Sequence, residues 1–490
     1  MIVKYIKKVG FKLIRKFLKW TRRVLLGYLI YLIVTGLLPF AGSPDVDDAF
    51  KERFSTDQFY SDTVGVDRAA VIDDSVDALN LRIQMVSQAK ERIILSSFSL
   101  KRDLSCKEIF STVLEAADRG VNVQILVDGL SGWMDMKNDP MYYVLGTHPN
   151  IEIRYYNMIN FLEPWTANGR LHDKFLIVDD TCLILGGRNT SNYFLGNYNT
   201  KVLSYDRDIF VYNTKTGTDK TKSSSISDTI SYFESLWDCK YSETVFNKVP
   251  SGKKGKVKAS EEELRSIYQT MLMERPELLS EVNYYNITIE TNKITLITNP
   301  THIWTKQPYI WYTLVELMKE ADERVYVQTP YMVLNRDMYA DLTEIADSVP
   351  QFDILLNSIA GGDNVMASSD YRFNRKKVLA IGANFHEFQG SHSMHNKSLV
   401  IDDDLAIIGS FNFDMRSVYL DTEVMMVVNG EAFTKSLENE FFRMEQESLP
   451  VYADGTYGTN GDVTPLTISP AKAIFYRITS IVFQLFRFIL

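Results

Sequence analysis

The sequence predicts an α/β protein made of two duplicated halves, preceded by a transmembrane helix. Three observations support this fold class: strands alternate with helices in two separate blocks, a His-x-Lys-x4-Asp pattern follows each block, and an uncharged apolar run lies near the N-terminus. A chain of 490 residues is also long enough for two or more domains. We place the two halves at about 44–214 and about 280–450.

The N-terminal region predicts a membrane anchor. Residues 1–23 contain nine Lys or Arg and no acid, and the 18-residue apolar run 24–41 follows. That run is near the lower limit for crossing a bilayer of roughly 30 Å hydrocarbon thickness. Because basic residues stay on the cytoplasmic side, a single-pass helix would place both halves outside the cell membrane. A cleaved signal peptide is the alternative, although Pro39-Phe40-Ala41 is a poor cleavage site.

The two α/β blocks have matching patterns. Segment 90–128 contains the strand ERIILSSFSL, the helix CKEIFSTVLEAADRG and the strand VNVQILVDG. Segment 310–360 contains two helical stretches that alternate with the strands RVYVQTPYM and FDILLNS. Such alternation is typical of a largely parallel sheet covered by helices. Gly120 and Gly382 follow helical runs and are natural C-terminal stops.

Two further regions differ in composition from the halves. Residues 215–279 include polar Lys- and Ser-rich stretches, and we expect a linker with a helix near 230–237. Residues 451–490 form a tail that ends in an amphipathic helix after Pro470. That helix either docks on the globular core or lies in a membrane interface, and the pattern fits both interpretations.

Charge and cysteine content narrow the classes of function. The formal net charge is -9 and the pI is about 5.4, whereas a nucleic-acid-binding protein usually carries a basic field. Cys106, Cys182 and Cys239 are too few and too scattered for a disulfide framework or a zinc site. We therefore expect no nucleic-acid partner, no metal and no cofactor.

The repeated motif supplies the candidate catalytic residues. It reads LHDKFLIVDD in the first half and MHNKSLVIDD in the second, and LILGGRN and AIIGSFN follow. The distance from His to the downstream Asn is 17 residues in both copies, which makes the pattern specific. The candidates are the two histidines, lysines, aspartates and asparagines of these copies: His172, Lys174, Asp179 and Asn189, and His395, Lys397, Asp402 and Asn412.

This set of side chains suits displacement at a phosphodiester. His and Lys two positions apart on a strand point to the same face, so imidazole and ammonium enter one cavity together. One histidine can attack phosphorus while the other protonates the leaving alkoxide. The lysines and asparagines can hold the non-bridging oxygens as charge develops. Each half supplies only part of this chemistry, so both copies are needed for one site.

The chain resembles the phospholipase D superfamily, and more narrowly the bacterial cardiolipin synthases. Besides the paired motifs, the resemblance rests on AADRGVNVQILVDG, YVQTPYMV, ILLNSIAGGD and GSFNFDMRSVYLDTE, and it covers about 67–450. It implies two phospholipase-D-like α/β/α sandwich halves that share one active site at a pseudo-twofold interface. Two departures are Gly186-Gly187, where the second copy has Gly409-Ser410, and one membrane span instead of two.

The resemblance also implies roles for individual residues. His172 would form a phosphohistidine, and His395 would act as the general acid and base. An acidic residue beyond each Asn would orient the paired imidazole, and Asp208 and Glu423 match by position. Asp179 and Asp402 would then be more structural than catalytic.

The leading functional prediction is synthesis of cardiolipin from phosphatidylglycerol and a second phospholipid. The partners would be phospholipid substrates and the membrane, while the identity of the donor and the oligomeric state stay open. A phospholipase D hydrolase that releases phosphatidic acid is the first alternative, because water can take the same intermediate. A superfamily nuclease and a membrane scaffold with inactive motifs are the others.

Overall fold

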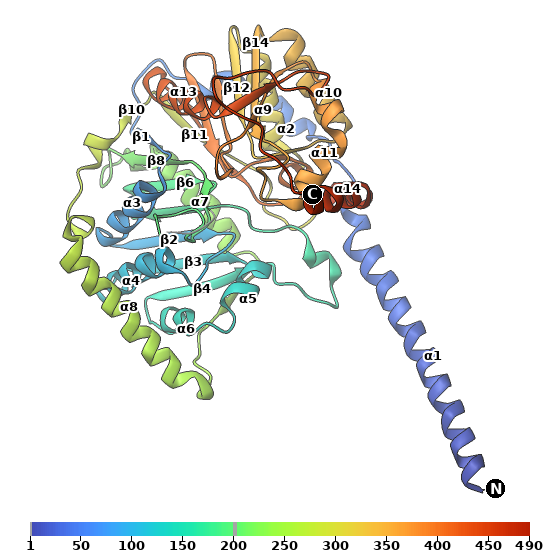
Figure 1. The fold of residues 1–490 in the computed structure, drawn as a ribbon. Coiled ribbons are helices and arrows are strands. Elements are labelled where there is room, and N and C mark those ends of the chain that lie inside the picture. The colour runs from blue at the N-terminus through green and yellow to red at the C-terminus, as the bar shows by residue number, and fades with distance from the viewer. Residues whose placement is uncertain (1, 199–202) are drawn as a thin grey trace.

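The computed structural model describes residues 2–198 and 203–490 and places two mixed sheets face to face (Figure 1). The first sheet has the order β10-β1-β8-β6-β5-β2-β3-β4-β9. Its strands are β1 (Asp67–Ile72), β2 (Arg92–Ser97), β3 (Asn122–Asp128), β4 (Ile151–Tyr156), β5 (Phe175–Val178), β6 (Cys182–Gly186), β8 (Asp208–Asn213), β9 (Ser242–Val245) and β10 (Ile289–Glu290).

Apart from the edge strand β10, the second sheet repeats this arrangement strand by strand, in the order β11-β20-β18-β17-β12-β14-β15-β21. Its strands are β11 (Lys293–Thr298), β12 (Arg324–Gln328), β14 (Gln351–Asn357), β15 (Asn384–Phe388), β17 (Ser398–Ile401), β18 (Leu405–Gly409), β20 (Val424–Asn429) and β21 (Ser448–Val451). The predicted duplication of an α/β unit is therefore confirmed.

The expectation of a largely parallel sheet is wrong. Strands β2, β3 and β4 are parallel, as are β12, β14 and β15, but the remaining neighbours in each sheet pair antiparallel. The physical reason lies in the connections. Strands β5 and β6 are joined by the short turn 179–181, and a connection of that length can only reverse the chain.

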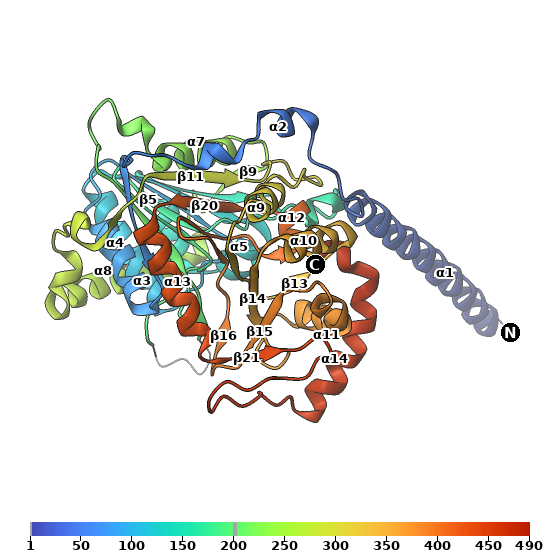
Figure 2. The same ribbon diagram turned by 90° about the horizontal axis from the view of Figure 1, so that it is seen from above.

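Helices cover the outer faces and also cross between the halves (Figure 2). Helices α3 (Ser75–Ser87) and α4 (Leu104–Asp118) pack outside the first sheet, and α9 (Tyr309–Lys319), α10 (Arg336–Ser348) and α11 (Val365–Leu379) belong to the second half. Helix α7 (Ser225–Trp237) contacts β11, and α13 (Glu431–Glu445) contacts β1. A shared apolar core, which includes Phe175, Phe233, Val400 and Phe441, lies between the sheets. The halves are thus joined by packing as well as by the chain.

The segment 215–279 is not a solvated linker. Strand β9 pairs with β4 at the edge of the first sheet, and α8 (Lys254–Glu274) packs on α4 and on α6 (Pro140–Gly146). Leu264 and Met271, on the inner face of α8, are buried. Lys254, Lys256 and Lys258, part of the Lys-rich composition that suggested a linker, lie on the exposed face of this helix, so the first half extends well beyond residue 214.

The N-terminal helix α1 (Ile2–Gly36) projects from the globule (Figure 1). Within the described residues, Phe11–Phe40 is the one stretch whose length and apolar composition would allow it to cross a membrane. The expected segment 24–41 is therefore part of a longer helix that includes the basic residues. Its end is held by the globule, because Asn168 donates to the Gly36 carbonyl at 2.8 Å and Phe40 is buried.

The Asp-Asp pairs that end each motif make equivalent turns. Asp179 and Asp402 have φ values of 54° and 49°, a left-handed conformation that Asp tolerates better than most residues. The carboxylate of Asp179 accepts hydrogen bonds from the backbone N–H groups of residues 90–92. Asp402 does the same for residues 322–324. Each aspartate therefore fixes the start of the neighbouring strand, β2 or β12.

Candidate active site

The two motif histidines meet at the interface because each motif pairs with the other half. Leu171 forms a parallel bridge with Thr422, and β16 (Ser393–Met394) pairs with β7 (Ser204–Tyr205). His172 and His395 directly follow these pairing segments. The backbone N–H of His395 donates to the Tyr205 carbonyl at 2.6 Å, which fixes the start of the second motif. Backbone pairing between the halves thus aims both imidazoles at one place.

His172 is held by a carboxylate of the second half. Its Nδ1 lies 2.8 Å from Oε1 of Glu423, and Glu423 is fully buried. The hydroxyls of Ser417, at 2.7 Å, and of Ser410 donate to the same carboxylate. The resemblance placed Glu423 in this position, and the contact is present. Because Nδ1 is occupied, Nε2 is the nitrogen of His172 that remains available to a substrate.

His395 is held by a carboxylate of the first half, but the residue is Asp206 and not Asp208. The His395 Nδ1 lies 2.7 Å from Asp206 Oδ2, and Lys397 Nζ lies 2.7 Å from the same nitrogen. Asp208 instead forms buried ion pairs with Arg82 at 2.9 Å and Arg188 at 3.0 Å. The expected histidine-orienting role of Asp208 is therefore wrong.

Sheet register explains this correction. Gly186 pairs with Asp208, whereas the equivalent Gly409 pairs with Met425. The position equivalent to Glu423 is thus Asp206, which lies just before β8. Two acids two residues apart in SYDRDIF both fitted the pattern, and only the strand register separates them.

The motif lysines are buried beside the histidines. Lys174 and Lys397 are 2% and 1% exposed, and each ammonium donates to the backbone carbonyl of its own motif histidine. The four side chains lie in extended segments just before β5 and β17, and not within the strands as expected. The ammonium of Lys397 contacts its imidazole, whereas that of Lys174 contacts the backbone of its histidine. Neither lysine is among the residues that line the cavity described next, so the expectation that both enter it with the imidazoles is not met.

One cavity of about 440 Å³ joins the two half-sites. His172, His395, Asn189 and Asn412 all line it. Its other walls carry apolar and charged side chains of both halves and of the C-terminal segment, including Phe98, Leu130, Arg170, Met366, Asp414, Arg416, Asp421, Ile489 and Leu490. A reacting group held here could contact both imidazoles and both amides.

Burial and neighbouring charge set the protonation of the site. Burial lowers the pKa of both histidines, and the adjacent lysines lower it further, with the larger effect on His172. Burial also lowers the pKa of Lys174 to about 7 and of Lys397 to about 8. A neutral His172 imidazole beside partly charged lysines can accept an anionic phosphodiester.

The carboxylates that hold the two histidines, Glu423 and Asp206, have pKa values shifted in opposite directions. Burial raises the pKa of Glu423 to about 8, although Lys174 and the serine hydroxyls oppose this effect. Burial also opposes ionisation of Asp206, but Lys397 and His395 outweigh it and lower the pKa of Asp206 to about 2. His395 therefore faces a fixed negative charge, whereas His172 faces a carboxyl group that holds its proton more readily.

Asp179 and Asp402 do not belong to this constellation, which corrects their inclusion in the predicted catalytic set. Each lies beyond the far end of β5 or β17 from its motif histidine, and Asp179 lines a separate surface cavity with Lys90, Tyr212 and Glu281. Their carboxylates are engaged with backbone N–H groups, as described above. The motif acid defines the sequence pattern without reaching the site.

The structure also explains Gly187, which replaces the serine of the second copy. A Cβ at this position would lie 2.3 Å from an oxygen of Asp206, so a side chain would displace that carboxylate. The matching Ser410 contacts Glu423 rather than the cavity. The missing hydroxyl therefore affects the support of a carboxylate and not the positioning of substrate.

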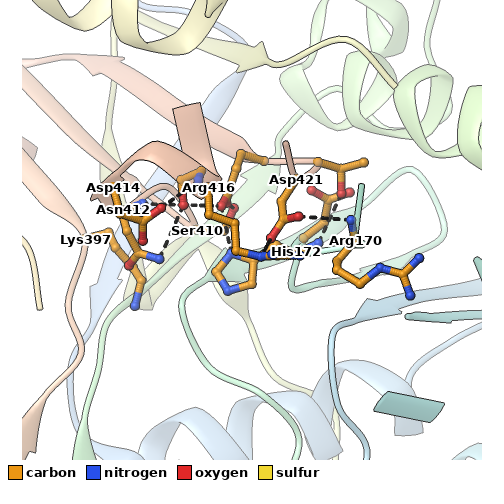
Figure 3. A network of polar contacts seen from close by, with 12 residues as sticks. Arg170, His172, Lys397, Ser410, Asn412, Asp414, Arg416 and Asp421 are labelled. Carbon is orange, nitrogen blue, oxygen red and sulfur yellow. Dashed lines mark hydrogen bonds and ion pairs between the residues drawn. The ribbon is translucent and has the colours of Figure 1, made fainter. Parts of the chain in front are cut away.

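Sequence reasoning missed a charged chain beside the histidines. Asp421 accepts from the Arg170 backbone N–H at 3.0 Å and pairs with Arg416 at 2.7 Å (Figure 3). Asp414 caps α12 (Met415–Tyr419) by accepting from the Ser417 backbone N–H at 2.6 Å. All but Arg170 lie in or next to GSFNFDMRSVYLDTE, and that stretch was the signal that could have marked them.

Duplicated α/β halves with a shared, paired His-Lys-Asn site define the phospholipase-D-like class of enzymes. The family model "Cardiolipin synthase, PLD-like domain" matches residues 82–216 and 314–445, which is more than half of the chain. The chain therefore belongs to this family, as its sequence motifs suggested.

Relatives and solved structures agree with this assignment. Cardiolipin synthase C of Escherichia coli K12 is 25% identical over 419 residues, which cover 77% of this chain and 84% of that protein. An uncharacterized protein of Helicobacter pylori 26695 is 27% identical over 425 residues, covering 78% of this chain and 81% of the relative. The phosphatidylserine synthase of Haemophilus influenzae Rd KW20 has the same fold, with a TM-score of 0.61 at 13% identity over 86% of this chain and 95% of that one.

Exchanging the two neighbouring aspartates tests which one serves His395. We expect Asp206→Asn to lower kcat by about 10²–10⁴-fold, because an amide does not stabilise a protonated imidazole as a carboxylate does. Losing the anion also lowers the pKa of His395, so the alkaline limb of the pH–kcat profile should move to lower pH. Steady-state kinetics across pH measure both effects.

Asp208→Asn is the matched control for this prediction. It leaves Arg82 and Arg188 with one partner fewer in a buried site, and thermal unfolding should show a loss of about 3 kcal/mol. The pH–kcat profile of the folded fraction should stay in place. A profile that shifts with Asp208→Asn and not with Asp206→Asn would reverse the assignment.

Proposed function

We propose that the protein is a phosphatidyltransferase that makes cardiolipin from phosphatidylglycerol and a second phospholipid. The main observation in support is that two imidazoles line one cavity, and that each is held at Nδ1 by a carboxylate of the opposite half. One site thus offers a nucleophile and an acid-base group at the same phosphodiester. The cardiolipin synthases among the relatives support the choice of lipids.

In the first step, His172 Nε2 attacks phosphorus of the donor lipid and the bond to its headgroup oxygen breaks. His395 gives its proton to that oxygen, and the alcohol leaves. In the second step, His395 takes the proton of a glycerol hydroxyl of phosphatidylglycerol. That oxygen attacks the phosphohistidine, the bond from phosphorus to nitrogen breaks, and His172 is restored. Lys174, Lys397, Asn189 and Asn412 hold the non-bridging oxygens during both steps.

The unequal electrostatics of the half-sites support His172 as the nucleophile. Its pKa is lowered well below the ordinary value of 6.5 by burial and Lys174, so its imidazole is neutral and nucleophilic near pH 7. Burial and Lys397 lower the pKa of His395 as well, but the ionised Asp206 beside it opposes this effect and so favours, relative to His172, the protonated form that a general acid requires. The two roles therefore follow from the stronger pKa depression at His172 and from the ionised carboxylate at His395.

A phospholipase D hydrolase is the second candidate, because water could replace the lipid alcohol at the same intermediate. Leu130, Met366, Ile489 and Leu490 line the cavity and favour a lipid acceptor over water. A nuclease is less well supported, since the chain has a net charge of -9 and a long apolar helix.

Products of purified enzyme distinguish these functions. With labelled phosphatidylglycerol, alone or mixed with phosphatidylethanolamine, we expect labelled cardiolipin after lipid separation. Phosphatidic acid as the sole labelled product would replace transfer with hydrolysis. Cleaved DNA without lipid turnover would exclude both lipid functions.

Covalent trapping tests the nucleophile. With phosphorus-labelled phospholipid, His172→Ala should lose all protein-bound label, because the atom that attacks phosphorus is gone. His395→Ala should still accumulate label, slowly, because the nucleophile remains and only proton transfer is impaired. Acid-quenched gel electrophoresis reads both variants. Label retained by His172→Ala and lost from His395→Ala would exchange the two roles.

We further propose that both halves lie on the outer side of the cell membrane. The supporting observation is the basic composition of residues 1–23 before the apolar stretch of α1. A protease added to intact cells should then degrade the globular part. Full protection until the membrane is permeabilised would place the site in the cytoplasm.

A further inference from the structure

Helix α14 (Pro470–Val482) exposes large apolar side chains to solvent. Ile478, Ile481 and Leu485 in the helix and its 3-10 extension are 60%, 63% and 73% exposed, although all three are large and apolar. Ile474, Phe475, Val482 and Phe486 are exposed as well. A helix that docks on a protein in water normally presents the opposite face to solvent.

The inner face of this helix buries Tyr476 and is also held by polar contacts. Arg487 and Gln484 bind the buried carboxylate of Asp370 at 2.6 and 2.8 Å, and Thr479 lies 2.8 Å from Ser369. Asp370 and Ser369 both belong to α11. These contacts fix the rotation of α14 about its axis. The exposed apolar side chains, which we call the apolar stripe, therefore point away from the globule; they are Ile474, Phe475, Ile478, Ile481, Val482, Leu485 and Phe486.

Helix α14 lies on the side of the globule from which α1 projects, as both ribbon views show (Figures 1 and 2). In Figure 2, α14 runs across that side instead of away from it. The neighbouring loop adds Phe161 and Leu162, which are 71% and 76% exposed. Tyr28 and Tyr31 of α1 donate to the backbone carbonyls of these residues at 2.8 and 2.6 Å. Three apolar features thus share one side.

The active-site cavity reaches the same side. Ile489 and Leu490, just beyond α14, line the cavity together with Ala167 and Met366. Ala167 ends the 3-10 turn Pro164–Ala167, which packs against α1. The backbone N–H of Arg416 donates to the Leu490 carbonyl at 2.8 Å, so the C-terminal segment is tied to the site wall.

We propose that α14 is an interfacial membrane helix that lies flat on a phospholipid bilayer, next to the point where α1 enters it. The apolar stripe and Phe161-Leu162 sit at the acyl boundary, and the exposed Arg477 lies at the level of the headgroup phosphates. A bilayer is favoured over a second copy of the chain because α14 lies on the side of the globule from which the apolar helix α1 projects. The membrane contact does not depend on the proposed function, but its catalytic consequence does.

Depth-dependent quenching tests the contact in the full chain. Cys106 and Cys182 are buried, so Cys239→Ser leaves a background for single labels. An environment-sensitive fluorophore is placed on Ile478→Cys, and the protein is reconstituted in vesicles of phosphatidylglycerol and phosphatidylethanolamine. With a nitroxide on the acyl chains, this label should lose most of its emission.

The matched control is Lys258→Cys on α8, a helix that lies far from α1 in Figure 1; the Lys258 side chain is 79% exposed. Its label should keep its emission in the same vesicles. Equal emission from both labels with the nitroxide lipid would overturn the proposal. A label on Ile478→Cys that is shielded only as protein concentration rises, without lipid quenching, would assign the stripe to a second copy and overturn it as well.

Activity separates this proposal from the proposed function. The double variant Ile478→Glu with Ile481→Glu should lower turnover of long-chain lipid in vesicles, chiefly by raising KM. Turnover of a short-chain, water-soluble phosphatidylglycerol should be unchanged, because the side chains lie outside the cavity. Equal loss on both substrates would contradict a membrane role. If the wild type turns over neither lipid, the proposed function fails while the quenching result still decides the membrane contact.

Discussion

The pairing of each motif histidine with a carboxylate of the opposite half is the constraint on which the rest of the structure depends. Glu423 holds His172 and Asp206 holds His395, so neither half contains a complete site. The bridges Leu171–Thr422 and Met394–Tyr205 carry this exchange in the backbone. A duplicated unit can meet such a requirement only if its two sheets stay locked together. The shared apolar core and the crossing of α7 and α13 between the halves supply that rigidity.

Symmetry of the backbone does not produce symmetry of charge. Glu423 receives serine hydroxyls from its own half, whereas a glycine at 187 brings Asp206 close to the first half's backbone without such a donor. Both lysines donate to the backbone carbonyl of their own histidine, and Lys397 also lies 2.7 Å from His395 Nδ1. These differences act on buried groups, where electrostatic effects are strong because water is excluded. Two equivalent histidines can therefore take unequal parts in one reaction without any change in the fold.

The sequence was sufficient to predict features that depend on local residue patterns. The two α/β units and the histidines, lysines and asparagines of the site follow from period-2 and helical patterns at fixed spacing. Features that depend on register or on packing were not accessible in this way. Asp206 and Asp208 both fitted one pattern until the pairing of Gly186 with Asp208 separated them. Strand β9 and helix α8 read as a polar linker because their composition reflects the exposed face alone.

The C-terminal helix shows why amphipathicity by itself does not state which face a helix buries. The pattern of α14 fitted both a docked helix and an interfacial one, and it packs against α11 through Asp370 and Ser369. In water, a contiguous row of exposed Ile, Leu and Phe side chains is unfavourable and invites aggregation. Attachment of the opposite face through Tyr476 and polar contacts is consistent with apolar surroundings on the outer face. Anchoring therefore orients the helix, and the orientation in turn places the cavity wall at Leu490 beside the surface from which a lipid would enter.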